Sequence, residues 1–250
     1  MRRFWIVISF MAIISTLGLY LYRYSSMART DDNRHARWES SEAWRLSSLA
    51  SKPSTDITNV DVERMVGEGW VPDDDMVIVR GNLPSDLKIS SITNLRGVTL
   101  ASRTVSTRDI SSVSNCLTLQ YVCFLECDFD NNCDWSKLMP SSIVHLSFWN
   151  CRMSRDTMIA IVKRLPRGLV VLELGDLPFS DSDINMLQLY RKLQHVGLVG
   201  NTTLTDIGFK ELCEIPSLVV VNVSEYSRNI SRSAKNEVLN GNQLIFLSES

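Results

Sequence analysis

Residues that could carry out chemistry are few in this chain. It holds three histidines and six cysteines among 250 residues. Cys123 beside His145 would set a thiol nucleophile next to a base, and Glu173 with His145 and His195 would offer ligands to a metal ion. A zinc site requires three or four ligands within about 2.3 Å of the metal. A cysteine nucleophile requires an oxyanion hole, and nothing in the sequence supplies one. We therefore expect no catalytic residue, no cofactor and no metal, with an enzyme built on His145, Glu173 and Cys123 as a remote alternative.

Other signatures of chemistry are absent from the sequence. No serine–histidine–acid order, phosphate-binding glycine loop or pair of catalytic carboxylates emerges, and Gly197 with Gly200 is too sparse to form such a loop. The net charge is −2, so the chain offers no basic face for phosphate neutralisation, which argues against nucleic acid as a partner. A hydrophobic content of 44% is sufficient for a full core.

The elements that position these residues repeat along the chain. Seven runs share the form apolar-x-x-apolar-x-apolar, and their starts are 24, 24, 26, 24, 25 and 26 residues apart. They begin at Leu95, Leu119, Ile143, Leu169, Leu193, Leu218 and Leu244. Each run predicts a strand, and residues 76–79 predict an atypical strand before the first of them. The period lies in the range of leucine-rich repeats.

Over residues 76–250 the chain resembles the leucine-rich repeat family. The family motif asks for Asn or Cys three residues after the last strand leucine, and Cys127, Cys151 and Asn201 occupy that position. Cysteine at this site, together with residues 204–218, is similar to the cysteine-containing, ribonuclease-inhibitor-like subclass. This resemblance implies an α/β solenoid with a curved parallel sheet on its concave side and helices on its convex side.

We expect Cys127, Cys151 and Asn201 to form a structural ladder whose side chains point inward and bond backbone carbonyls. Asn201 begins an Asn-Thr-Thr glycosylation sequon, but burial at this position would make that sequon accidental. Cys127 and Cys151 fall about 5 Å apart on adjacent turns, so a disulfide stays open as an alternative in an oxidising compartment. The family pattern is broken at three ladder positions, Arg103, Leu177 and Tyr226.

Helix starts follow most of the strands. Ser154 is expected to cap a helix over residues 155–165, and Thr205 to cap one containing Phe209 and Leu212. Ser180 or Ser182 precedes a third helical pattern, and Ser106 or Thr107 a fourth.

The strand residues between the motif leucines should line the concave face. Aromatic side chains among carboxylates in this position favour recognition of a protein or peptide, with Tyr121, His145 and Trp149 as the expected hot spot. The full set of expected binding residues is Tyr121, Cys123, His145, Trp149, Glu173, Asp176 and His195.

The amino-terminal segment predicts a membrane anchor. Residues 4–22 contain no charge and follow Arg2 and Arg3, and a helix of that length spans about 28 Å, close to the thickness of a bilayer core. A cleaved signal peptide, cut after Ala28, is the competing interpretation. The expected division is a transmembrane signal anchor at 1–24, a juxtamembrane stalk at 25–56, an amino-terminal cap at 57–92 and about seven repeat turns at 93–250.

Taken together, the sequence predicts a single-pass membrane protein whose repeats lie on the non-cytoplasmic side and bind protein ligands without catalysis. A cytoplasmic or organellar adaptor or assembly factor of the cysteine-containing repeat type is the alternative. The last run, at Leu244, lies close to the carboxyl terminus without an obvious cap. An open strand edge there predicts a possible homodimer through the end of the solenoid.

Overall fold

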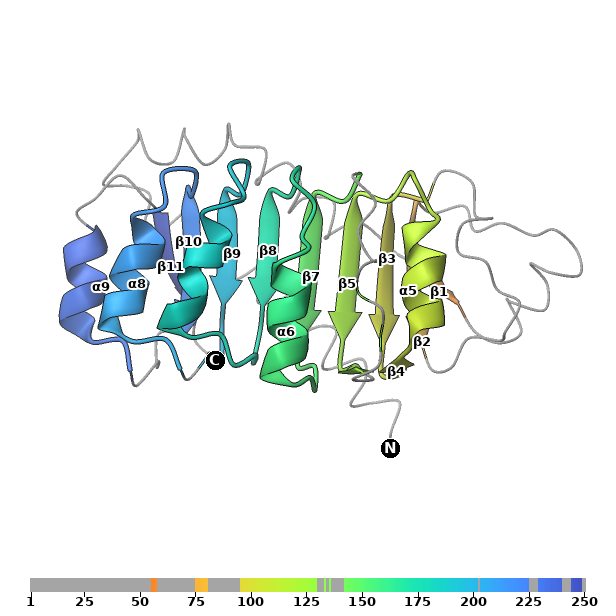
Figure 1. Ribbon diagram of the computed structural model, residues 1–250, viewed down its shortest axis with the longest axis horizontal. Helices are drawn as coiled ribbons and strands as arrows, with labels where there is room; N and C mark the ends of the chain where they lie inside the picture. The colour runs from red at the N-terminus through yellow and green to blue at the C-terminus, as the bar shows by residue number, and fades with distance from the viewer. Residues whose placement is uncertain are drawn as a thin grey trace, which may run out of the picture.

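The computed structural model describes residues 55–57, 75–80, 95–129, 133, 135, 142–201, 203–224, 229–239 and 244–248. Within them, nine strands form one sheet in which every neighbouring pair is parallel. In spatial order they are β1 (Thr55–Ile57), β2 (Met76–Arg80), β3 (Gly97–Ala101), β5 (Tyr121–Leu125), β7 (His145–Trp149), β8 (Val171–Leu174), β9 (His195–Leu198), β10 (Val220–Ser224) and β11 (Leu244–Ser248). Spatial order follows chain order, as a solenoid requires (Figure 1).

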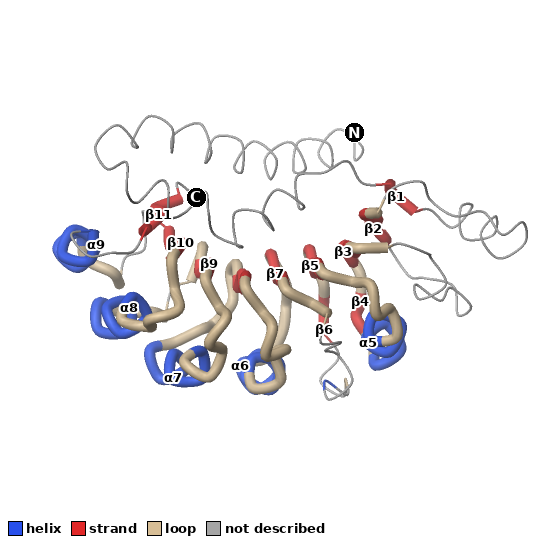
Figure 2. Tube along the Cα trace, turned by 90° about the horizontal axis from the view of Figure 1, so that it is seen from above, coloured by secondary structure: helices blue, strands red, loops and turns tan. Residues whose placement is uncertain are grey.

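The described helices lie on the outer curve of this sheet (Figure 2). They are α5 (Thr107–Ser114), α6 (Arg155–Val162), the 3₁₀ turn η4 (Asp181–Asp183) with α7 (Ile184–Leu187), α8 (Asp206–Cys213) and α9 (Arg232–Leu239). The predicted helix starts are confirmed at Ser154 and Thr205, whose side chains accept from backbone N–H groups of the first turn. Of the paired candidates, Ser106 and Ser180 are the caps, each in a capping box with an aspartate three residues later.

Two short strands were not expected from the sequence. β4 (Thr104–Val105) and β6 (Asp128–Phe129) pair in parallel and form a second sheet at the turn that follows β3 and β5. Two residues are too few to give an alternating pattern, so sequence periodicity cannot detect such strands.

The core consists of stacked columns of motif residues. The first motif leucine of each turn precedes its strand and is buried, from Leu95 to Leu218. Two further inward columns lie within the strands, and all their members are at most 1% exposed: Val98, Val122, Leu146, Leu172, Val196 and Val221, and Leu100, Phe124, Phe148, Leu174, Leu198 and Val223. Phe124 and Phe148 stack with their ring centroids 5.0 Å apart. The apolar positions of the repeated motif are thus the positions whose side chains form the core.

The last turn differs from the sequence prediction by two residues. We placed Leu244 at the first motif position, but β11 pairs Leu244 with Val220, which holds the third position. This register aligns Ile245 with Val221 and Leu247 with Val223, both inward positions. The predicted alignment was wrong because it would have set Glu249 opposite Val223, at a position where apolar residues fill the core.

The sheet extends further towards the amino terminus than the seven runs indicate. The expected strand at residues 76–79 is present as β2, and β1 pairs with it in front. At the other end β11 is the last strand of the sheet among the described residues, and the dimer through this edge stays a prediction. None of the described helices is long and apolar enough to cross a membrane. The predicted anchor at residues 4–22 and the stalk before Thr55 lie outside the described residues.

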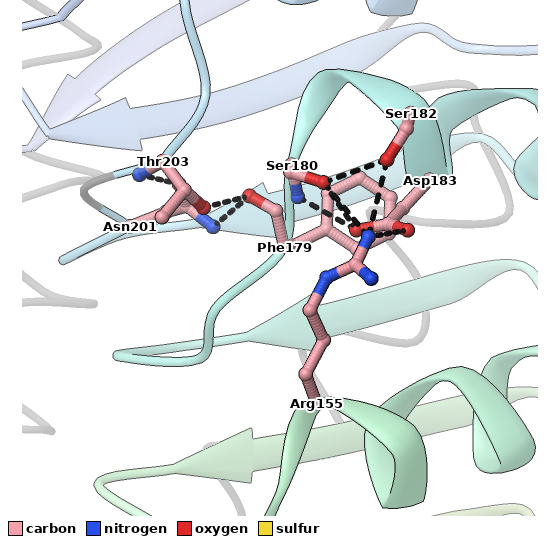
Figure 3. A network of polar contacts seen from close by, with 7 residues as sticks. All are labelled: Arg155, Phe179, Ser180, Ser182, Asp183, Asn201 and Thr203. Atoms are coloured by element: carbon pink, nitrogen blue, oxygen red, sulfur yellow. Dashed lines mark hydrogen bonds and ion pairs between the residues drawn. The ribbon is translucent and has the colours of Figure 1, made fainter.

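Ladder positions carry hydrogen bonds between successive turns. The Cys127 thiol donates to the Leu100 carbonyl at 3.2 Å, and the Cys151 thiol to the Phe124 carbonyl at 3.3 Å. Both thiols are free. Asn201 is 5% exposed, and its Nδ2 donates to the carbonyls of the preceding turn (Figure 3). Arg103 departs from the motif, and it is buried in an ion pair with Asp109 at 2.6 Å.

Polar side chains also join consecutive helix starts on the convex side. Arg155, at the start of α6, forms an ion pair with Asp183 of η4 at 2.6 Å (Figure 3). Asp181 accepts from the backbone and hydroxyl of Thr205, and Asp206 of α8 accepts from Ser231 before α9. Each of these inter-turn braces spans one repeat, so the helices are held in register by contacts to their nearest neighbours.

Candidate functional site

The candidate site lies on the concave face of the sheet, opposite the helices (Figure 2). Parallel pairing without register shifts places residues of equal motif position side by side. One row across the strands contains Tyr121, His145, Val171 and His195, and the next contains Cys123, Ser147, Glu173, Gly197 and Asn222. Because each row crosses the strands at right angles, residues that are 24 to 26 positions apart in the sequence become neighbours.

Glu173 on β8 is the centre of a hydrogen-bonded group on this face. Its Oε2 accepts from Ser147 Oγ at 2.9 Å and from Trp149 Nε1 at 3.3 Å. His145 Nε2 lies 2.9 Å from Ser147 Oγ and 3.4 Å from the same Glu173 oxygen. We call these four residues, Glu173, His145, Ser147 and Trp149, the Glu173 cluster. The structure therefore brings together three of the expected binding residues and adds Ser147.

The environment of the cluster keeps Glu173 ionised. Burial alone would raise the pKa of its carboxyl, but the hydrogen bond from His145, the nearby imidazoles and the Ser147 hydroxyl outweigh burial and lower the pKa to about 2. Burial lowers the pKa of His195 to about 4, so His195 is neutral at pH 7. The site thus presents a fixed carboxylate beside a neutral imidazole.

Two aromatic side chains, Tyr121 beside the cluster and Trp149 within it, give the site its apolar surface. The Tyr121 ring meets the His145 ring edge-on, with 4.6 Å between centroids. The Trp149 indole lies against Gly175, where a Cβ atom would come within 2.3 Å of the ring. Tyr121, Trp149 and Glu173 keep partial exposure, whereas His145 is buried. Of the expected hot spot, Tyr121 and Trp149 therefore form the accessible part, and His145 supports them from beneath.

Burial also distinguishes the other expected binding residues. Cys123 and His195 are buried, in contrast to the open strand face that the alternation predicts. Asp176 is exposed at the rim beyond β8, with a left-handed φ of 60°. It belongs to a column of left-handed turn residues, Ser102, Glu126, Asn150, Asp176 and Gly200, that ends the strands in five turns. The structure does not bring Asp176 into the Glu173 cluster.

The arrangement of serine, histidine and acid in the cluster is not that of a catalytic triad. In a triad the acid binds Nδ1 of the histidine, while Nε2 faces the serine. Here Glu173 approaches Nε2 and itself accepts the Ser147 proton. The Cys123 thiol has its pKa raised to about 12 by burial, so it is not a thiolate nucleophile at neutral pH. Among the described residues no group of three or more His, Cys, Asp or Glu side chains is placed to hold a metal ion.

An open cavity of about 710 Å³ lies away from this cluster, at the rim that follows β3, β5 and β7. Its lining includes Glu126, Asn150 and the ion pair of Arg152 with Asp128. Both partners of that pair are largely exposed, so solvent screens it and its contribution to stability is about 0–1 kcal/mol. The cavity contains none of the expected binding residues.

Asn222 is a residue of the concave face that lies outside the expected set of binding residues. It lies two strands from Glu173, with Gly197 between them in the same row. Its side chain is 8% exposed, and its Oδ1 accepts no hydrogen bond from the described part of the chain. The signal that identifies it is its motif position, which it shares with Glu173 and Ser147.

Comparison with known proteins finds similarity among solved structures only. No protein-family model and no curated protein matches the sequence. Among solved structures, an internalin from Listeria monocytogenes str. 4b F2365 matches with a TM-score of 0.47 and 14% sequence identity. The match covers 82% of this chain and 64% of the internalin chain.

Proposed function

We propose that this protein binds other proteins through the concave face of its repeats and performs no catalysis there. The observation that carries the proposal is the Glu173 cluster, whose Trp149 side chain is partly exposed, together with the partly exposed Tyr121 that packs against its His145. Aromatic residues held rigidly by hydrogen bonds lose little conformational entropy on binding, and such residues dominate binding energy in protein interfaces. The buried hydrogen bonds beneath them keep this surface in one geometry.

Photocrosslinking tests this proposal directly. A photoreactive phenylalanine analogue replaces Trp149 on the concave face in one variant and Leu189 on the outer surface in another, since Leu189 is 56% exposed. The expected result is a protein adduct from position 149 that is absent from position 189. Adding Tyr121→Ala to the first variant should remove the adduct. Equal adducts from both positions, or adducts indifferent to Tyr121, would count against concave-face binding.

The proposal includes attachment to a membrane through residues 4–22, with the repeats on the non-cytoplasmic side. It is supported by the length of the uncharged segment and by the arginines that precede it. Protease protection of a carboxy-terminal tag in intact cells, combined with alkaline extraction, tests it. Digestion of the tag with a stub retained in the membrane is expected. A protected tag that stays with the membrane would favour the cytoplasmic adaptor, and release into the supernatant would indicate cleavage of the anchor.

Membership of the cysteine-containing repeat subclass is also a proposal. It is supported by the thiol hydrogen bonds of Cys127 and Cys151 and by the helix that follows most of the strands.

A further inference from the structure

We propose that the concave face recognises an arginine side chain of the bound protein, which lies over Gly197 and donates hydrogen bonds to Glu173 and Asn222. The inference rests on the proposed function and specifies the chemistry of its partner. It follows from three observations on one row of the sheet: an oxygen of Glu173 that accepts no hydrogen bond, a strand position without a side chain, and a buried amide oxygen that also lacks a donor.

The first observation concerns the two oxygens of Glu173. All the donors of the Glu173 cluster meet Oε2, and Oε1 accepts no hydrogen bond from the described residues. The side chain is 14% exposed, and Oε1 is not among the fully buried unpaired atoms. No lysine or arginine among the described residues forms an ion pair with this carboxylate, whose charge faces only a hydroxyl, an indole and an imidazole. An ionised oxygen held in this way is suited to a cationic donor.

The second observation is the side-chain-free position beside it. Gly197 pairs with Glu173 on one side and with Asn222 on the other. A Cβ atom at Gly197 would lie 3.2 Å from Glu173 Cγ, which shows that the glutamate chain leans towards the glycine. With a strand spacing of about 4.8 Å, the backbones that carry Glu173 and Asn222 stand about 10 Å apart. That separation is wide enough for a flat side chain of a partner to lie between them.

The third observation is the acceptor at Asn222. Its Oδ1 is buried and accepts no hydrogen bond from the described residues, although leaving a buried acceptor unpaired is unfavourable. Glu173 and Asn222 occupy the same motif position on either side of Gly197, so one ligand with several donors in a plane could serve both acceptors. A guanidinium carries five N–H groups in a planar fork and stacks on aromatic rings such as that of Trp149. An ammonium is a compact charge with a stronger hydration shell, so arginine fits better than lysine. The neighbouring His195, neutral at pH 7, adds no opposing charge.

Selection from a random peptide library displayed on phage tests the inference on the full-length chain in detergent. Peptides enriched on the wild-type protein and depleted on Trp149→Ala should contain arginine more often than the starting library. In the strongest peptide, replacing that arginine by citrulline keeps its shape and removes its charge. The dissociation constant should rise tenfold or more with wild-type protein, the range of a hydrogen bond to a charged group.

Coupling between the two partners decides the assignment. Glu173→Gln and Asn222→Leu should each weaken the arginine peptide, and in Glu173→Gln the citrulline replacement should have little further effect. Glu211→Gln, an exposed change on the helical side, is the matched control and should bind both peptides as the wild type does. A full citrulline effect in Glu173→Gln, or selected peptides without arginine enrichment, would overturn the inference while leaving concave-face binding intact. Peptides that bind Trp149→Ala and Tyr121→Ala as well as the wild type, or the absence of any enriched peptide, would overturn both proposals.

Discussion

Replacement of Asn201 by alanine should be among the most destabilising single changes in the repeats. The buried side chain makes four hydrogen bonds to backbone groups. Its Nδ2 donates to the carbonyls of Leu177 and Phe179, and its Oδ1 accepts from the N–H groups of Thr203 and Leu204. Figure 3 shows the bonds to Phe179 and Thr203. Each such bond contributes about 1 kcal/mol net, and unpaired buried groups cost more. Partial relaxation of the turn offsets some of this loss, so we expect a decrease of about 3–4 kcal/mol in the free energy of unfolding.

Urea denaturation followed by tryptophan fluorescence measures this decrease, with Asn185→Ala on the exposed side of α7 as the control. The control should change stability by less than about 0.5 kcal/mol. Asn201→Asp separates hydrogen bonding from packing, because it keeps the size and the acceptors but loses both donors when ionised. Relative to the wild type at the same pH, it should regain part of its loss near pH 4, where a protonated carboxyl donates again. A loss below about 1 kcal/mol for Asn201→Ala would refute the role assigned to the ladder.

Three further predictions follow from the described residues. Glu126 has a left-handed φ of 54°, a conformation that Gly200 adopts without strain at the same position three turns later. Glu126→Gly should therefore raise stability by about 0.5–1 kcal/mol in urea titration, and no gain would contradict the strain argument. The pKa of His195 is lowered to about 4 in the folded protein, whereas the same side chain protonates near pH 6.5 in the unfolded chain. The free energy of unfolding therefore falls as the pH decreases from 6.5 towards 4, by at most about 1.4 kcal/mol per pH unit. His195→Gln should flatten this slope between about pH 6.5 and 4.5 in denaturation profiles. Asp183→Asn weakens both the capping box of η4 and the ion pair with Arg155, so thermal unfolding should show a loss of about 2 kcal/mol, and an unchanged midpoint would contradict it.

The sequence predicted the rows of the concave face because the repeat period determines the register. Once Leu119 and Ile143 are aligned, Tyr121 and His145 must be neighbours in a parallel sheet, and the structure pairs them. The same reasoning failed at the last turn, where the apolar run begins at Leu244, two residues after the first motif position. Residues 244–247 are all apolar, so apolarity alone did not distinguish the inward from the outward positions of this run. The charged Glu249 would have distinguished them, because the predicted alignment set it at an inward position.

Contacts within the site were less accessible from the sequence. The row containing Ser147, Glu173 and Asn222 follows from the period, but the choice of Oε2 for every donor to Glu173 depends on side-chain rotamers. Gly197 was considered only as part of a phosphate-binding loop, although its importance lies in the side chain it omits. Strand β1 has three residues, too short for any periodic signal.

The inter-turn braces determine how the chain would respond to force. Arg155 with Asp183, Asp181 with Thr205, and Asp206 with Ser231 each join one turn to the next, and none of them reaches beyond its neighbour. Pulling on one end of the solenoid therefore loads a single boundary at a time. Each turn that detaches releases about 24 residues, or about 80 Å of extended chain. Under tension the repeats would act as a series of extensible links that lengthen from the edge while the remaining concave face keeps its shape.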